Sequence, residues 1–276
     1  MGIEDLKVAI CVIGRLENAY VKEFVQWYEN MNFDKIFIYD NNHDNEEHFE
    51  DEIQSWIDNG IVEVINFRNR ENSQLPAYND CYKEHGDEYD FIAYIDFDEF
   101  LVLNDKYHNN IKEYLSEPIF KPYNCIHINW MIYDDNGLIK CDGRPLNERF
   151  THPIDYDKKI NYGQPENNHI KSILRGGLGN ITWGNPHSPY KNLNCCNNVG
   201  EKVNDSFCCK YNYELAYLKH FRYKTIEEFL SNKRKRGTAD RSYSTFLSTY
   251  DIDGFFKFNE RTKEKEEFIE KWKHPC

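Results

Sequence analysis

The first hundred residues alternate between short apolar runs and segments with helical periodicity, and this alternation limits the fold more than any other feature. The apolar runs, typical of strands buried on both faces, cover residues 7–13, 35–39, 61–65 and 91–95. Helical patterns fill the three gaps, from about residue 18, from about residue 49 and over about 75–84. This order predicts an α/β fold with a mostly parallel central sheet and helices on both faces.

Acidic side chains follow three of these predicted strands. Glu17 comes after the first, Asp40 after the second, and Asp96 with Asp98 after the fourth. No GxGxxG or GxxxxGK[ST] motif follows the first strand, so neither a dinucleotide site nor a P-loop is supported. Ligands of parallel α/β sheets bind beyond the carboxyl ends of the strands. We therefore expect these carboxylates to converge on one site.

The pattern changes from about residue 124. A strand is predicted over 124–133, and the segment 134–213 is rich in Asn, Gly, Pro and Cys. A helix is expected over 225–236, and a charged helix from about residue 261 closes the chain. Because neither an internal repeat nor a clear linker is present, we expect a single domain over residues 1–276 with an irregular second half.

Composition excludes some functions. The 276 residues are 40% hydrophobic and 16% aromatic, enough for a large core, and the net charge of −13 disfavours nucleic-acid binding. The tandem pairs Cys195-Cys196 and Cys208-Cys209 lack the spacing of a zinc knuckle, so free thiols in a reducing compartment are expected. The N-terminal apolar run is too short for a signal peptide or a membrane span. These features predict a cytoplasmic protein.

The stretch FIAYIDFDEFLVL, residues 91–103, places Asp96, Asp98 and Glu99 between two apolar segments. Buried carboxylates need cationic partners. Two carboxylates at i and i+2 can bind one divalent cation, and Mg²⁺ and Mn²⁺ prefer oxygen ligands. The alternative is a capping turn before a helix that starts near Asn104.

Three segments carry a resemblance to a known family. They are RLENAYVKEFVQWYENMNFDKIFIYDNN, QLPAYNDCYKEH and DFIAYIDFDEFLVL, in that order. They resemble bacterial members of glycosyltransferase family 92, glycosyltransferase-2-like enzymes of the GT-A fold. The close match covers residues 10 to about 105. Beyond it, the similarity is limited to HIKSIL at 169–174, PH at 186–187 and the segment 220–237.

The resemblance implies an inverting transfer of a hexose from a UDP-sugar, with galactose as the expected sugar. The implied acceptor is a glycan or lipid-linked glycan in bacterial surface polysaccharide synthesis. Residues 1–123 would form the nucleotide-sugar half and residues 124–276 the acceptor half. Contact with the inner face of a membrane is left open. The implied ligands of Mn²⁺ or Mg²⁺ are Asp96, Asp98 and His187, the last with a surface loop histidine as its alternative. The implied nucleotide-sugar residues are Glu17, Asp40, Asn42, Gln74, Asp96 and Lys171.

Inversion needs one general base for the acceptor hydroxyl. Glu148 is the first candidate, because in the GT-A enzymes that the chain resembles such a residue lies shortly after the acceptor-side strand. Asp135 and Asp134 are the next candidates. The alternative for Glu148 is a surface salt bridge to Arg144 or Arg149.

Cationic and aromatic side chains complete the predicted site. Lys171, Arg222 and the run 233–236 are candidates for the diphosphate, and the alternative for the run is a solvated helix end. Trp183 is favoured as a sugar contact, whereas the mid-strand Trp130 is expected in the core.

Two rival functions remain open. Phosphoryl transfer of the haloacid-dehalogenase type also places Asp-x-Asp after an apolar strand. That chemistry requires Thr or Val where this chain has Phe100. The second rival is a glycan-binding or nucleotide-sugar-binding scaffold without turnover, against which the two intact aspartates argue.

Overall fold

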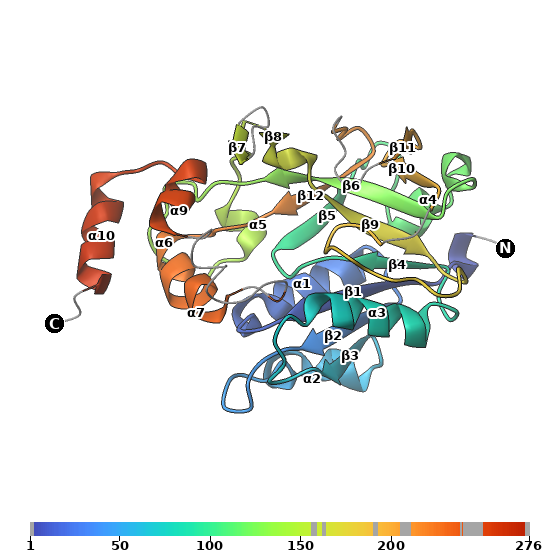
Figure 1. The fold of residues 1–276 in the computed structure, drawn as a ribbon, viewed down its shortest axis with the longest axis horizontal. Helices are drawn as coiled ribbons and strands as arrows, with labels where there is room; N and C mark the ends of the chain where they lie inside the picture. Colours follow the sequence, from blue (N-terminus) through green and yellow to red (C-terminus); the bar gives the residue numbers. More distant parts are fainter. Residues whose placement is uncertain are drawn as a thin grey trace.

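A computed structural model describes residues 3–155, 159–161, 164–189, 193–204, 211–237, 239 and 251–273. One sheet runs through these residues with the strand order β11-β10-β6-β9-β4-β1-β2-β3 (Figure 1). Strand β12 pairs with β6 and also with β5, which extends the sheet at its centre. The sheet therefore joins the two halves of the chain.

The elements have the following bounds. The strands are β1 (Val8–Gly14), β2 (Lys35–Asp40), β3 (Val62–Asn66), β4 (Phe91–Tyr94), β5 (Glu99–Leu103), β6 (Cys125–Ile132), β7 (Lys159–Asn161), β8 (Gln164–Pro165), β9 (Ile170–Arg175), β10 (Cys195–Asn197), β11 (Lys202–Val203) and β12 (Ala216–His220). The helices are α1 (Asn18–Asn30), α2 (Glu50–Asp58), α3 (Gln74–His85), α4 (Ile111–Leu115), α5 (Leu146–Arg149), α6 (Ile226–Glu228), α7 (Arg234–Arg236), α9 (Ile252–Phe258) and α10 (Lys263–Lys273).

The N-terminal half has the predicted βα order. Strands β4, β1, β2 and β3 are parallel neighbours. Alternate residues of β1 enter two different cores: Ile10 packs with Phe24 on the face covered by α1 and α2, and Cys11 packs with Tyr78 on the face covered by α3. Burial on both faces explains why β1 is apolar throughout, and it confirms the predicted layers.

The segment after the acidic turn is a strand, so the alternative of a helix near Asn104 is wrong. Strand β5 pairs antiparallel with β12, and Leu101 lies opposite Leu218. Both side chains are almost fully buried, and this burial favours the strand. The next helix, α4, begins only at Ile111.

The second half is more regular than its composition suggests. Strand β9 inserts antiparallel between β4 and β6, and both β10 and β12 run parallel to β6. These strands pair with partners far away in the sequence, so their pairing cannot be predicted from a local sequence pattern. Within the described residues, no helix combines the length and apolar character needed to cross a membrane.

Candidate active site

A cleft of about 350 Å³ opens beyond the carboxyl ends of β1 and β4. Its walls come from both halves of the chain: the segments after β1, β2 and β4, the start of α3, strands β6, β9 and β12, and the helical run 226–236. Of the sequence-predicted site residues, the cleft is lined by Glu17, Gln74, Asp96, Asp98, Lys171 and His187.

Asp96 begins the turn that follows β4 and is held by three side chains. The Nζ atom of Lys171 lies 2.8 Å from its Oδ2 atom. Gln74 Nε2 and the Tyr78 hydroxyl donate hydrogen bonds to Oδ1 at 2.9 and 3.1 Å. Burial by itself would lower the pKa of Lys171, but Asp96 and Glu99 raise it well above its usual value. Lys171 therefore supplies a fixed positive charge beneath the turn.

Asp98 lies deeper, with only 5% of its surface exposed. Lys233 Nζ lies 3.3 Å from its Oδ2 atom, and His220 Nε2 lies 3.6 Å from its Oδ1 atom. Burial alone would raise the pKa of Asp98, but Lys233 and His220 bring it well below its usual value. Asp98 is therefore ionised, and both of its carboxylate oxygens face cationic or titratable partners.

Glu99, the third acid of the turn, has a structural role. Its side chain is fully buried, and its Oε2 atom accepts a hydrogen bond of 3.0 Å from the backbone N–H of Asp96. Burial raises the pKa of Glu99 well above its usual value; Lys171 opposes this shift, while Asp96 and Asp98 add to it. Asp96 and Asp98 thus line the cleft, whereas Glu99 is buried behind the turn and stabilises it through the hydrogen bond to Asp96.

Asp40 and Asn42 do not line the cleft, contrary to the nucleotide-contact roles that the resemblance implied. Arg68 Nε lies 2.7 Å from Asp40 Oδ2, and the side-chain amide of Asn42 donates to Asp40 Oδ1 at 2.7 Å. Leu16 N–H in turn donates to Asn42 Oδ1 at 2.8 Å. These buried contacts hold the loop after β1 in place. The neighbouring Asn41 and His43 line the cleft.

Glu17 lies at the start of α1 and forms an ion pair with Arg236. Arg236 belongs to a continuous helical run. The run begins with a capping box formed by Thr225 and Glu228, and it includes a π-helical turn, Phe229–Lys233. Such π turns recur at functional sites. Lys233, Lys235 and Arg236 all line the cleft; Lys235 is exposed, but the alternative of a solvated helix end is wrong for Lys233 and Arg236, whose side chains are only 10% and 15% exposed.

The cleft has the opposite charge to the protein as a whole. Among the residues that the structure describes, seven lysine and arginine side chains line it, against four carboxylates. The chain carries a net charge of −13. Concentrated positive charge in a recess attracts anionic ligands. Sequence reasoning pointed to some of these cations, but it gave no role to Arg15, which begins the first family-like segment, or to Arg70, which adjoins no recognisable motif.

Of the two tryptophan predictions, that of Trp130 in the core is confirmed, and that of Trp183 as a sugar contact gains no support. Trp183 is buried against Tyr78 and Tyr94 and does not line the cleft. Trp130 does line it, and its ring stacks on His169 at 4.8 Å between ring centroids. Rings of two further histidines lie close, His220 at 4.3 Å and His187 at 5.4 Å.

The donor set at the turn suits Mn²⁺ or Mg²⁺ in its chemistry. His187 Nδ1 lies 2.9 Å from the carbonyl oxygen of Ile170, so Nδ1 carries the proton and Nε2 the lone pair. Carboxylate oxygens from Asp96 and Asp98 would supply the hard ligands. Within the described chain, these three are not among the groups whose three donor atoms lie within 4.8 Å of one another. Binding of an ion there would require them to come closer.

The three candidate bases do not line the cleft. Glu148 is exposed on α5. Asp135 is buried, 2.7 Å from Lys265 Nζ, and Asp134 Oδ1 accepts a hydrogen bond from the backbone N–H of Asn136. Their assignment as base gains no geometric support. The salt-bridge alternative for Glu148 is wrong as well, because the partners of the two arginines are different residues: Asp142 for Arg144, and Glu228 for Arg149.

A parallel α/β sheet with a basic cleft and an Asp-x-Asp turn at its strand ends defines a protein built for anionic ligands. The chain belongs to glycosyltransferase family 92, whose sequence profile matches residues 5–243. Its mostly parallel sheet with helices on both faces is the arrangement expected of the GT-A fold that the resemblance implied. A search of curated proteins found no match.

Solved structures provide more distant matches. One is TarS 1–349 of S. aureus in complex with UDP-GlcNAc, with a TM-score of 0.45 and 12% identity over 95% of this chain and 78% of that chain. Another is the mannosyltransferase PcManGT from Pyrobaculum calidifontis in complex with GDP-Man and Mn²⁺. Its TM-score is 0.33, with 9% identity over 44% of this chain and 35% of that chain. The chain spans 38% and 44% of the protein in two further TarS structures, one of them TarS 1–349 in complex with UDP, and 35% in PcManGT.

Proposed function

We propose that this enzyme transfers a hexose from a UDP-sugar to a glycan acceptor, with inversion at the anomeric carbon. The observation that carries the proposal is the basic cleft at the strand ends of an acidic family 92 chain, with the ionised Asp98 at its base. A nucleoside diphosphate is an anion of the charge that such a cleft attracts.

The cations have separable roles in this proposal. Lys171 is held by Asp96 and keeps the turn in place. Lys233 and Arg236 lie on the helical run and face the cleft, where they would neutralise a diphosphate. Both already pair with carboxylates, Lys233 with Asp98 and Arg236 with Glu17, so an incoming phosphate would compete for existing ion pairs.

Asp96, Asp98 and His187 would hold the divalent cation. When bound, Mn²⁺ or Mg²⁺ neutralises the diphosphate and stabilises the departing phosphate. The chain's own contribution is orientation: Gln74 and Tyr78 fix one carboxylate, and the hydrogen bond to Ile170 fixes the imidazole tautomer.

The acceptor is a glycan or a lipid-linked glycan of the kind used for bacterial surface polysaccharides, with galactose as the expected donor sugar. Sugar rings pack on aromatic faces, and we assign such a contact to the edge of Trp130 that lines the cleft. A lipid-linked acceptor would bring the protein to the inner face of a membrane.

The experiment that tests the proposal is a calorimetric titration of UDP, UDP-galactose and UDP-glucose, first with Mn²⁺ and then with EDTA. We expect metal-dependent UDP binding and a preference among the sugars. Absence of binding under both conditions would overturn the donor assignment. Binding without transfer or hydrolysis of any donor would favour the non-catalytic scaffold.

A further inference from the structure

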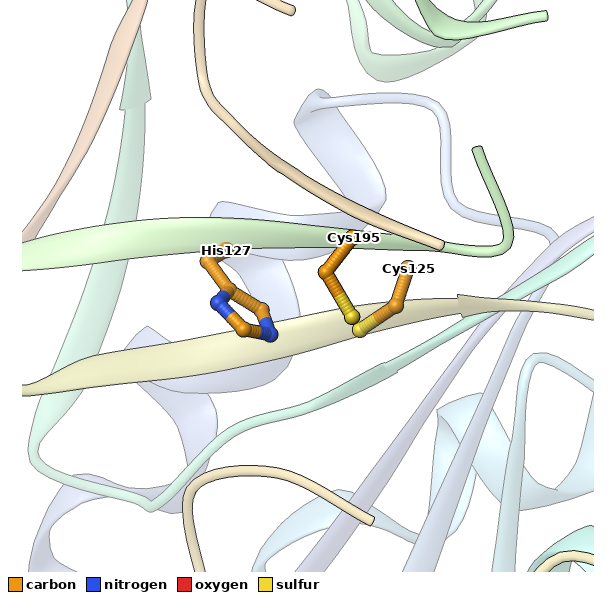
Figure 2. A group of neighbouring side chains, drawn as sticks. All are labelled: Cys125, His127 and Cys195. Carbon is orange, nitrogen blue, oxygen red and sulfur yellow. The ribbon is translucent and has the colours of Figure 1, made fainter. Parts of the chain in front are cut away.

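A second group of metal-type ligands lies apart from the cleft, on strands β6 and β10 (Figure 2). Cys125 and His127 are two residues apart on β6, and therefore point to the same face of the sheet. Cys195 on β10 lies directly opposite Cys125 in a parallel pair. One donor atom from each of the three lies within 4.8 Å of the other two.

His127 gives an independent sign that a ligand is missing. Only 1% of its surface is exposed, and within the described residues no oxygen or nitrogen atom pairs with its ring nitrogens; its polar neighbour is the Cys195 thiol. Burying polar atoms without partners is costly. A metal ion would satisfy one of these nitrogens and would also give the two thiols, both free here, a common partner.

We propose that Cys125, His127 and Cys195 form a Zn²⁺ site that is separate from the nucleotide-sugar cleft. Thiolate and imidazole ligands select Zn²⁺, whereas the oxygen-rich turn at Asp96 and Asp98 suits Mn²⁺ or Mg²⁺. Ligand atoms around tetrahedral Zn²⁺ lie about 3.3 to 3.8 Å apart, a spacing compatible with this cluster. Three protein ligands leave the fourth position to water.

The surroundings suit such a site. Cys195 is half-buried whereas Cys125 and His127 are buried, so an ion can enter from the Cys195 side. The approach to β10 is anchored to the start of β6, because Asn124 N–H donates to the carbonyl of Asn194 at 2.8 Å. The ligands are therefore largely in place before an ion arrives.

The cluster is also linked to the cleft. Ser172 pairs with His127 across β6 and β9, and its hydroxyl donates to the carbonyl oxygen of His187 at 2.6 Å. An ion that ties β10 to β6 would therefore stiffen the strand behind a cleft residue. The site has a structural role in this proposal, because no cleft-lining residue belongs to it.

The test is a Co²⁺ titration of the purified full-length chain, reduced with a phosphine that does not bind metals. We expect a near-ultraviolet charge-transfer band from thiolate to Co²⁺, which saturates at one equivalent and disappears when Zn²⁺ is added. Oxygen ligands at the Asp-x-Asp turn cannot give that band, so cobalt bound there is distinguished. Absence of the band would overturn the proposal.

Variants locate the site. Cys195→Ser and Cys125→Ser should abolish the band and weaken Zn²⁺ binding by more than about 100-fold, above the range of about 10- to 100-fold for outer-shell partners. The exposed Cys141→Ser is the matched control and should keep both. A band that persists in Cys195→Ser would overturn the assignment.

Wild-type protein supplies a further check if a variant fails to fold. Zn²⁺ should slow alkylation of Cys195, as measured by mass spectrometry, and leave alkylation of Cys141 unchanged. It should also raise the thermal unfolding midpoint, because the folded chain, in which the three ligands are assembled, binds it more tightly than the unfolded chain. Equal alkylation of Cys195 with and without Zn²⁺ would contradict the proposal, as would a Cys125–Cys195 disulfide whose reduced form takes up no metal.

Discussion

Asp98 and Lys233 are 135 residues apart in the sequence, yet their Oδ2 and Nζ atoms lie 3.3 Å apart at the base of the cleft. The contact joins the turn after β4 to the helical run of the second half. Burial lowers the pKa of Lys233 to about 8, and Asp98, which opposes this shift, does not outweigh it. The cleft is thus assembled from both halves of the chain.

Replacing the carboxylate of this pair tests the proposed metal site. Asp98→Asn keeps the size of the side chain but removes its charge. We expect UDP affinity in Mn²⁺ to fall at least about tenfold, or ~1.4 kcal/mol, to the level measured in EDTA. Asp105→Asn, at an exposed position outside the cleft lining, is the control. Retained Mn²⁺-dependent affinity in Asp98→Asn would refute the assignment.

The lowered pKa of Lys233 predicts a pH dependence of binding. Lys233 is charged below its pKa, so UDP affinity should decline as the pH rises through about 8. Lys233→Arg remains charged in this range and should remove the decline, whereas Lys235→Arg, at the exposed neighbour in the same run, should keep it. Titration calorimetry at a series of pH values measures both. An unchanged decline in Lys233→Arg would assign it to another group.

Glu228 predicts a pH-dependent contribution to stability. Both of its carboxylate oxygens accept hydrogen bonds of 2.9 Å from Arg149, and the Tyr20 hydroxyl donates a third at 2.8 Å. Burial alone would raise the pKa of Glu228, but Arg149 lowers it to about 2. A lowered pKa stabilises the fold above the unfolded value, and this contribution is lost as the pH falls towards the folded value.

We therefore expect Glu228→Gln to lower the free energy of unfolding by about 3 to 5 kcal/mol at neutral pH, because it leaves Arg149 buried without its anion. The difference from wild type should shrink below the usual glutamate pKa and vanish as the pH approaches about 2. Urea unfolding at several pH values measures it. Glu227→Gln, on the same turn, is the control, and a pH-independent deficit in Glu228→Gln would contradict the assignment.

Replacing Glu148 tests its sequence-based assignment as the general base. The side chain is exposed and absent from the cleft lining, so Glu148→Gln should keep both donor affinity and transfer rate. Removing a true general base costs about 10²- to 10⁴-fold in rate. A loss of that size with intact UDP binding, measured by release of UDP, would reinstate Glu148. Asp135→Asn is a poor control, because it also breaks the buried pair with Lys265.

Local patterns were enough to predict much of the first half. Apolar runs buried on both faces and amphipathic helices can be recognised from a few consecutive residues. Strands β1 to β4 accordingly lie within one or two residues of their expected bounds. The convergence of Glu17, Asp96 and Asp98 followed from the rule that parallel strands end at one edge, but Asp40, which was expected to join them, is buried against Arg68 and does not line the cleft. The alternative reading of the acidic turn, as a cap before a helix near Asn104, is wrong, because pairing of β5 with β12 cannot be seen from either strand alone.

The sequence by itself determined the α/β layers, the acidic turn and the family, because each is carried by residues close together in the chain. Only the tertiary structure decided which charges meet. It buried Asp40 and Asn42 in contact with each other and brought Lys233 to Asp98. It also placed Trp130 rather than Trp183 in the wall of the cleft. It also brought Cys195 opposite Cys125, where the sequence indicated only free thiols. Ion pairs and ligand sets depend on distances between segments remote in sequence, and those distances are fixed when the strands pair.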